Sequence, residues 1–350
     1  MTKLVFGETQ SKKKLGMTTQ TKPSSRLSLG RIKEAAQVID PVFTNTPQFL
    51  AESLSQRLGL RLICKVEICN PIRSFKGRGA DYFLSQLNGE SRRLVCASAG
   101  NFGQGLAFAA RKRGIRLTVF TSENANPLKL ERMRRLGAEV RLQGVDFDAA
   151  KAAARAFALQ EDSHFVEDGL EAALSEGAGT IALELCRLPE PLDAIFVPLG
   201  NGALINGIGC WMKAHSPNTK IVGVCAAGAP AMELSWRSKN MVTTDVVNTI
   251  ADGIAVRVPV SQALEDMENV VDDVLLVDDA AVLRAMNLLF VELGLIVEPA
   301  GAVGVAAALC FRERFADAHI ATPLCGGNVT GEQIRNWYQL SEVVSADSSA

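Results

Sequence analysis

"RLVCASAGNFGQGLAFAARKRG", residues 93–114, contains the pattern that decides the fold. Its first half is an apolar run with the length of a buried strand, and a glycine-rich turn follows that run directly. Its second half reads as a helix that Gly114 closes. A strand, a glycine turn and a helix in this order form the repeating unit of an α/β fold.

The same unit recurs from about residue 60 onward. The pattern predicts strands at 61–68, 93–100, 116–121, 139–144, 194–200 and 220–226. It predicts helices at 76–87, 103–114, 126–137, 146–160 and 203–215, with Asp146 as an N-cap and Gly137 as a terminator. Residues 293–309 and 320–328 repeat the strand–turn–helix logic, whereas 226–280 is weakly patterned and is expected to wrap the core. Alternating strands and helices predict an α/β protein with open parallel sheets and helices on both faces.

Composition excludes several classes of function. The 350 residues suffice for one large or two smaller domains, and the net charge of −1 argues against a nucleic-acid partner. The eight cysteines form no CxxC pair, and the three histidines are dispersed, so buried thiols of a reducing compartment are expected rather than disulfides, a zinc site or a Ser-His triad. No apolar stretch is long enough to cross a bilayer, and residues 1–30 are expected to form a mobile tail.

Four glycine-rich turns fall at predicted strand ends, where α/β folds bind ligands. In "GNGALING" (200–207) glycines let backbone N–H groups approach a phosphate, although a plain strand–helix turn explains it equally well. Because Cys225 and Ala226 stand where a dinucleotide site needs an acid, a single phosphate monoester fits better than a nucleotide. "SAGNFGQG" (98–105) offers a cup for a carboxylate, or else an unliganded Asn-Gly turn.

Lys76 lies in "NPIRSFKGRGA", residues 70–80. A solvated lysine is the default interpretation of any single lysine. The functional alternative is a Schiff-base lysine, which must be neutral and must lie next to a phosphate site. Arg73 and Arg78 would favour the neutral amine, and Phe75 would exclude water.

Taken together, these segments resemble pyridoxal-phosphate enzymes of the tryptophan-synthase-β type (fold type II), within them the serine/threonine dehydratase and serine racemase group. The resemblance covers roughly residues 40–330 and rests on "SFKGRGA", "ASAGNFGQG", "GAGTIALEL", "DAIFVPLGNGALINGI", "TIADGIAV", "EPAGAVGVAA" and "LCGGN", which follow the family's order. It implies a two-domain fold, with a large cofactor-binding domain of residues 31–91 and 161–340 and a small domain of residues 92–160.

The resemblance also implies roles for individual residues. Lys76 would bind pyridoxal 5'-phosphate as a Schiff base and act as the base at Cα. The phosphate would lie against Gly200, Asn201, Gly202, Ala203 and Leu204, of which Asn201 and Ala203 depart from the family's nearly all-glycine pattern. Phe75 and Gly253 would sandwich the ring, Asn101 would meet its 3′ oxygen, Cys325 would face its nitrogen, and Glu298 would lie beside it. Ser98, Ala99, Gly100, Asn101 and Phe102 would form the substrate loop, with Ser98, Asn101 and the Phe102 N–H holding the carboxylate.

Departures from the family refine these expectations. Racemases of the group have a second serine where this chain has Ala99, so efficient racemisation is not expected. Cys225 replaces a glutamate of their cation site, so no metal is expected there. Phe102 replaces the usual histidine, which suggests a more apolar substrate such as phenylserine. A chain of 350 residues leaves no room for the regulatory domain of biosynthetic threonine dehydratases, so isoleucine feedback is not expected.

The sequence therefore predicts a cytoplasmic pyridoxal-phosphate ammonia-lyase, a dehydratase of amino acid metabolism that converts a β-hydroxy-α-amino acid to a 2-oxo acid and ammonia. The enzyme alternatives are an amino-acid racemase and a β-replacement synthase, and the non-enzyme alternative is a binding protein that kept the fold. The expected partners are a small-molecule amino-acid substrate and a second copy of the chain in a homodimer, with no nucleic acid and no membrane.

Overall fold

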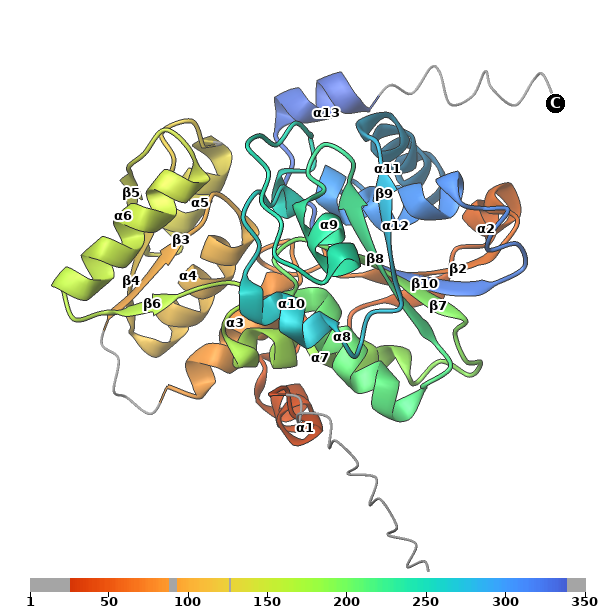
Figure 1. Ribbon diagram of the computed structural model, residues 1–350, viewed down its shortest axis with the longest axis horizontal. Coiled ribbons are helices and arrows are strands. Elements are labelled where there is room, and N and C mark those ends of the chain that lie inside the picture. Colours follow the sequence, from red (N-terminus) through yellow and green to blue (C-terminus); the bar gives the residue numbers. More distant parts are fainter. Residues whose placement is uncertain (1–25, 88–92, 126, 339–350) are drawn as a thin grey trace, which may run out of the picture.

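The structure is a computed structural model that describes residues 26–87, 93–125 and 127–338. It contains two sheets with helices packed around them (Figure 1). The larger sheet has the strand order β1-β2-β10-β7-β8-β9, and the smaller has the order β5-β4-β3-β6. Among the described residues, neighbouring strands pair in parallel except β1 and β2, which are antiparallel. The predicted α/β class is confirmed.

The elements have the following bounds. The larger sheet contains β1 (Gln48–Leu50), β2 (Arg61–Val66), β7 (Ala194–Pro198), β8 (Lys220–Ala226), β9 (Asp273–Val277) and β10 (His319–Leu324), and the smaller contains β3 (Arg93–Ala97), β4 (Arg116–Thr121), β5 (Glu139–Leu142) and β6 (His164–Val166). The helices are α1 (Leu29–Val38), α2 (Glu52–Leu58), α3 (Lys76–Ser85), α4 (Asn101–Arg113), α5 (Pro127–Arg135), α6 (Phe147–Gln160), α7 (Ala172–Leu185), α8 (Ala203–His215), α9 (Ala231–Ser238), α10 (Ser261–Met267), α11 (Asp279–Leu293), α12 (Pro299–Cys310) and α13 (Gly331–Trp337), with short 3₁₀ turns η1 (Pro41–Phe43) and η2 (Asp252–Ile254).

The smaller sheet lies to one side of the larger one, with α4, α5 and α6 connecting its strands (Figure 1). The predicted helix signals hold here, because Asp146 accepts a hydrogen bond from the Ala149 N–H and Gly114 ends α4 in a left-handed conformation. The expected boundary between residues 160 and 161 is wrong by one strand, since β6 pairs with β3 in the smaller sheet. Strand β6 has only three residues, of mixed polarity, and so short a segment carries too little pattern to be recognised as a strand.

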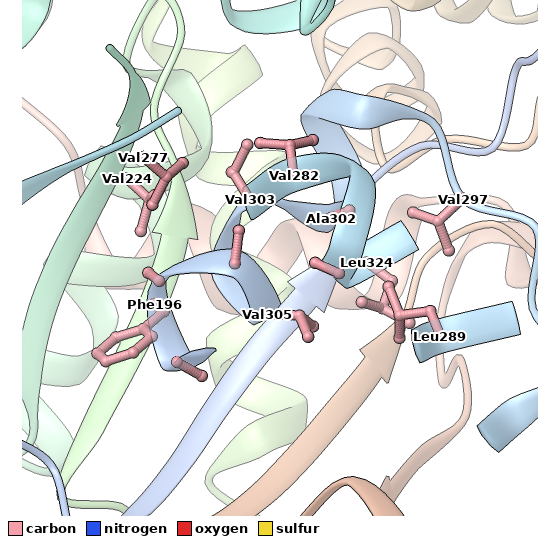
Figure 2. Packing of buried hydrophobic residues seen from close by; sticks show 14 of the residues in the cluster. Phe196, Val224, Val277, Val282, Leu289, Val297, Ala302, Val303, Val305 and Leu324 are labelled. Carbon is pink, nitrogen blue, oxygen red and sulfur yellow. The ribbon is translucent and has the colours of Figure 1, made fainter. Parts of the chain in front are cut away.

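Helix α12 forms the centre of the larger domain. Figure 2 shows its side chains, among them Val303 and Val305, between the sheet residues Phe196 and Val224 and the neighbouring helix residue Val282. The helix approaches the sheet closely, because a Cβ atom on Gly304 would lie 1.9 Å from Thr322 Oγ1. A helix buried on all sides is apolar all round, which matches its sequence.

The strand expected ahead of α12 is absent. Gly294 ends α11, and residues 295–298 form no strand although the first three of them are apolar. Strand β10 already pairs with β2 and β7, so the sheet has no free edge there. The backbone of Val297 instead pairs with the Tyr338 hydroxyl, which accepts from its N–H at 2.9 Å and donates to its carbonyl at 2.7 Å.

Part of the expected N-terminal tail belongs to the fold. Arg26 forms an ion pair with Asp266 at 2.8 Å, and Ser28 caps α1. Residues 1–25, the rest of that expected tail, lie outside the described residues. The weakly patterned segment 226–280 contains α9, η2, α10 and the edge strand β9. In the part of the chain that the structure covers, no helix has both the length and the apolar character needed to cross a membrane.

Candidate active site

One cavity of about 520 Å³ brings together all the residues that the sequence predicted for the site. Its walls come from turns at the carboxyl ends of β3, β7 and β10, where parallel sheets bind ligands. The predicted residues that line it are Phe75, Lys76, Ser98, Ala99, Gly100, Asn101, Phe102, Gly200, Asn201, Gly202, Ala203, Leu204, Gly253, Glu298 and Cys325.

Lys76 is the first residue of α3, and its side chain is 17% exposed. The preceding loop is fixed to the end of β10, because the Phe75 N–H and the Ser74 hydroxyl both donate to the Cys325 carbonyl. The Lys76 ammonium lies 4.8 Å from the ring centre of Phe75 and donates to Asp168 Oδ2 at 2.6 Å. The lysine thus points into the cavity and has one carboxylate partner there.

Arg78 does not face Lys76, contrary to the expectation that it would favour the neutral amine. Its guanidinium is fully buried and donates to Glu67 and Glu184, which neutralise it. Lys65 also donates to Glu184, at 2.5 Å. Burial alone would raise the pKa of Glu184, but Arg78 and Lys65 hold this pKa down at about 2. The network anchors α3, and with it Lys76, to β2 and α7.

The loop 200–204 has the properties of a phosphate site. It connects β7 to the N-terminus of α8, and Gly202 adopts a left-handed φ of 89° there. Among the described residues, the backbone N–H groups of 200–204 have no acceptor. Free N–H groups at a helix N-terminus favour an anion through hydrogen bonding and the helix dipole. The residues present therefore fit the phosphate of pyridoxal phosphate.

The loop 98–102 has free donors for a second anion. Ser98 Oγ accepts from the N–H groups of Gly100 and Gly103, which leaves its own hydroxyl proton available. The N–H groups of Asn101 and Phe102, at the start of α4, have no acceptor within the described part of the chain. This arrangement suits a carboxylate.

A hydrogen-bonded trio joins the two sheets at the back of the cavity. Asn101 Nδ2 donates to Glu298 Oε1 at 2.6 Å, and Asn328 donates to both Glu298 and Asn101. Burial raises the pKa of Glu298. Cys325 lies nearby with its thiol directed to the Ala300 carbonyl, and burial raises its pKa as well, so it remains a neutral thiol.

The cavity residues that sequence reasoning missed include three charged ones, Asp168, Lys129 and Asp252. Lys129 is 5% exposed and pairs with Asp252 at 2.5 Å across the two domains. Burial lowers the pKa of Lys129, but Asp252 and Glu298 together outweigh burial, so that this pKa is raised. The sequence could not distinguish Lys129 from the other charged residues of the segment 126–137. For Asp168, the only local signal was that a glycine follows it directly.

The position expected to have lost a cation site contains a buried thiol. Cys225, the penultimate residue of β8, donates to the Leu199 carbonyl, and burial raises its pKa. The described residues contain no group of three or more His, Cys, Asp or Glu side chains able to hold a metal ion. That no metal binds there remains a prediction.

Comparison with known proteins agrees with this geometry. A family model described as "Pyridoxal-phosphate dependent enzyme" matches residues 39–326. The chain is 34% identical over 311 residues to the biosynthetic L-threonine dehydratase of Lactococcus lactis, which covers 86% of this chain and 75% of that enzyme. It is 33% identical to the chloroplastic threonine dehydratase of Arabidopsis thaliana over 90% of this chain, and spans only 55% of that protein. Maize serine racemase superposes with a TM-score of 0.83 at 28% identity, covering 92% of this chain and 98% of that one.

Proposed function

Because the chain belongs to the family of pyridoxal-phosphate dependent enzymes, we propose that it is an ammonia-lyase for threonine or serine. It would convert such a β-hydroxy-α-amino acid to a 2-oxo acid and ammonia. One observation carries the proposal: the cavity combines the amine of Lys76, two sets of free anion-binding N–H groups, and Ala99 on the substrate loop. Named relatives with this chemistry are threonine dehydratases.

Each part of the cofactor has a group to hold it. Lys76 would bind its aldehyde carbon covalently, the N–H groups of 200–204 would bind its phosphate, and Phe75 and Gly253 would pack against its ring. When bound, pyridoxal phosphate withdraws electrons from the substrate Cα and makes the Cα proton acidic. The neutral thiol of Cys325 cannot hold a ring nitrogen protonated as a carboxylate would, which favours prompt loss of the β-substituent.

The chain's own residues perform the remaining tasks. The hydroxyl of Ser98 and the N–H groups of Asn101 and Phe102 would hold the substrate carboxylate. Lys76, once released from the cofactor, would take the Cα proton. The rings of Phe75 and Phe102, whose centres lie 4.8 and 5.8 Å from Lys76 Nζ, would shield this amine from part of the solvent.

A substrate panel tests the proposal. Purified protein loaded with pyridoxal phosphate is mixed with L-threonine, L-serine, phenylserine and 3-hydroxyaspartate, and 2-oxo acid and ammonia are measured. We expect equal amounts of both products from threonine and serine, and none from the Lys76→Ala protein. A D-amino acid with little 2-oxo acid would support a racemase instead, and a new β-substituted amino acid in the presence of a thiol would support a synthase.

A preference for a substrate bulkier than threonine, such as phenylserine, would come from the aromatic residues that line the cavity. Phe102, Phe147 and Phe165 line it, and they offer apolar contacts to a β-substituent larger than a methyl group. The named relatives give this preference no support, so threonine and serine remain the primary candidates. Turnover of phenylserine at least equal to that of threonine would establish it. The homodimer also stays a prediction, which sedimentation would check.

A further inference from the structure

Asp168 is the residue that contacts the reactive amine, and nothing in the proposed reaction so far uses it. Its Oδ2 atom accepts from Lys76 Nζ at 2.6 Å, and the two side chains are only 13% and 17% exposed. A charge-assisted bond this short in a partly dry pocket is a direct route for a proton. The pair is not an incidental surface contact.

The second carboxylate oxygen of Asp168 is buried and has no hydrogen-bond partner among the described residues. Buried polar atoms are nearly always paired, so an orphan in a catalytic cavity needs an explanation. Beside it lies a small cavity of about 10 Å³, which Lys76, Asp168, Phe102 and Leu174 help to line. Such a space is of the order of one water molecule. Asp168 therefore has one oxygen on the lysine and the other available for a small oxygen species.

The backbone around Asp168 is held firmly in this position. Gly169, with φ at 87°, packs so tightly against the phosphate loop that a Cβ atom would lie 2.2 Å from the Asn201 carbonyl oxygen. Arg26 donates to the carbonyls of Gly169 and Leu170. On the other side, Glu167 pairs with Arg155 of α6 at 2.5 Å. The carboxylate is thus fixed by elements of both domains.

We propose that Asp168 is a catalytic proton carrier that moves a proton from Lys76 to the departing β-hydroxyl. This inference rests on the proposed function. The Cα–H bond breaks and its proton forms an N–H bond on Lys76, whose ammonium then passes a proton to Asp168 Oδ2. The Cα electron pair forms the Cα=Cβ double bond, the Cβ–O electron pair leaves with oxygen, and the Asp168 proton makes that oxygen water. Lys76 ends neutral and Asp168 ends as a carboxylate, so no further reactant is required.

This transfer of a proton from Lys76 through Asp168 to the departing oxygen, called the relay below, makes a prediction about leaving groups. Hydroxide needs a proton to leave, whereas chloride does not, so Asp168→Asn should affect L-serine and β-chloro-L-alanine differently. Loss of a general acid slows a reaction by about 10²- to 10⁴-fold. We expect kcat for serine to fall by about 100-fold or more, and kcat for β-chloroalanine to fall by less than about tenfold. Equal slowing of both substrates, or of neither, would overturn the relay.

Two further measurements separate this role from a structural one. Pyridoxal phosphate uptake, followed by absorbance titration, should be within a few-fold of wild type in the Asp168→Asn protein. The matched control is Asp40→Asn, which removes a carboxylate from another lysine pair, Lys112 Nζ–Asp40 Oδ2 at 2.7 Å, outside the cavity. It should leave the serine-to-chloroalanine ratio of rates unchanged. A control that shifts this ratio as Asp168→Asn does would count against the relay.

A second variant covers the case in which Asp168→Asn does not fold. Asp168→Glu keeps a carboxylate but displaces it by one methylene, so serine should again be slowed more than β-chloroalanine. Equal slowing overturns the relay here too. Wild-type protein that forms pyruvate from neither substrate would refute the proposed function itself, and this outcome differs from wild-type turnover with equal slowing in the variants.

Discussion

Gly169 and Asn201 touch through their backbones, and a Cβ atom on Gly169 would lie 2.2 Å from the Asn201 carbonyl oxygen. Gly169 also has a φ of 87°, which L-residues rarely adopt. We expect Gly169→Ala to lower the free energy of unfolding by about 2 kcal/mol or more, because strain and collision add. The phosphate loop must shift as well, so affinity for pyridoxal phosphate should fall. Denaturant titration and absorbance titration measure the two effects.

Gly59 provides the matched control. Its φ of 66° is also left-handed, but no atom lies within 4 Å of the Cβ position. Gly59→Ala should therefore cost only the backbone strain, about 1 kcal/mol, and leave cofactor affinity unchanged. If the two variants lose equal stability, the contact between Gly169 and Asn201 is not what requires glycine.

The central strands could be predicted from the sequence, and three of the four edge strands could not. The predicted bounds 116–121 and 220–226 agree with β4 and β8, which are buried after their first residue and are largely apolar there. The strands that were missed, β1, β6 and β9, all lie at sheet edges. The apolar residues 295–297 gave a false strand, because periodicity cannot distinguish a buried loop from a buried strand.

The residues of the site also fall into those that could be predicted from the sequence and those that could not. Residues at glycine turns, such as Lys76 and Asn101, could be placed because the turns mark strand ends. Asp168 and Lys129 could not be assigned to the site, because the role of each depends on an ion-pair partner that is distant in the sequence. Lys76 and Asp168 are 92 positions apart, and Lys129 and Asp252 are 123 apart. Such pairs depend on the packing of the two domains.

The buried network of Arg78 predicts how stability depends on pH. Folding lowers the pKa of Glu184 from an ordinary 4.5 to about 2. A lowered carboxyl pKa contributes stability that is complete above the unfolded value and is lost as pH falls toward the folded value. The fold should therefore lose about 3 kcal/mol through this group between pH ~5 and ~2. Denaturant titrations across that range measure the loss.

Glu184→Gln should remove that part of the pH dependence. At neutral pH it should destabilise the fold by about 3–5 kcal/mol, because Arg78 and Lys65 lose a buried counter-ion. Glu190→Gln is the control, since Glu190 pairs with Arg61 on the surface and its loss should change the acid slope little. A slope that is identical in wild type and in Glu184→Gln would contradict the assignment.

The ion pair of the buried Lys129 with the exposed Asp252 predicts a functional effect rather than a large stability effect. Lys129 Nζ lies 3.7 Å from the Cβ position of Gly100, so its ammonium borders the carboxylate loop. Lys129→Met removes this charge, while Asp252 is 55% exposed and remains solvated. We expect kcat/KM for the amino acid to fall by about tenfold or more, since loss of one hydrogen bond to a charged group is worth about 1.5–3 kcal/mol. Lys112→Met, which breaks an exposed pair, should leave kcat/KM unchanged.

Ala99 predicts the stereochemical outcome of the reaction. It lines the cavity on the substrate loop. By the family resemblance, racemases of the group have a second serine at this position. Ala99→Ser would add a hydroxyl that can return a proton to the opposite face of Cα, and a positioned acid–base group contributes about 10²- to 10⁴-fold. The rate of D-serine formation from L-serine, measured by chiral chromatography, should rise at least about 100-fold. Ala99→Gly changes the side chain without adding a hydroxyl and should give no such rise. Equal D-serine from the two variants would show that residue 99 does not face Cα.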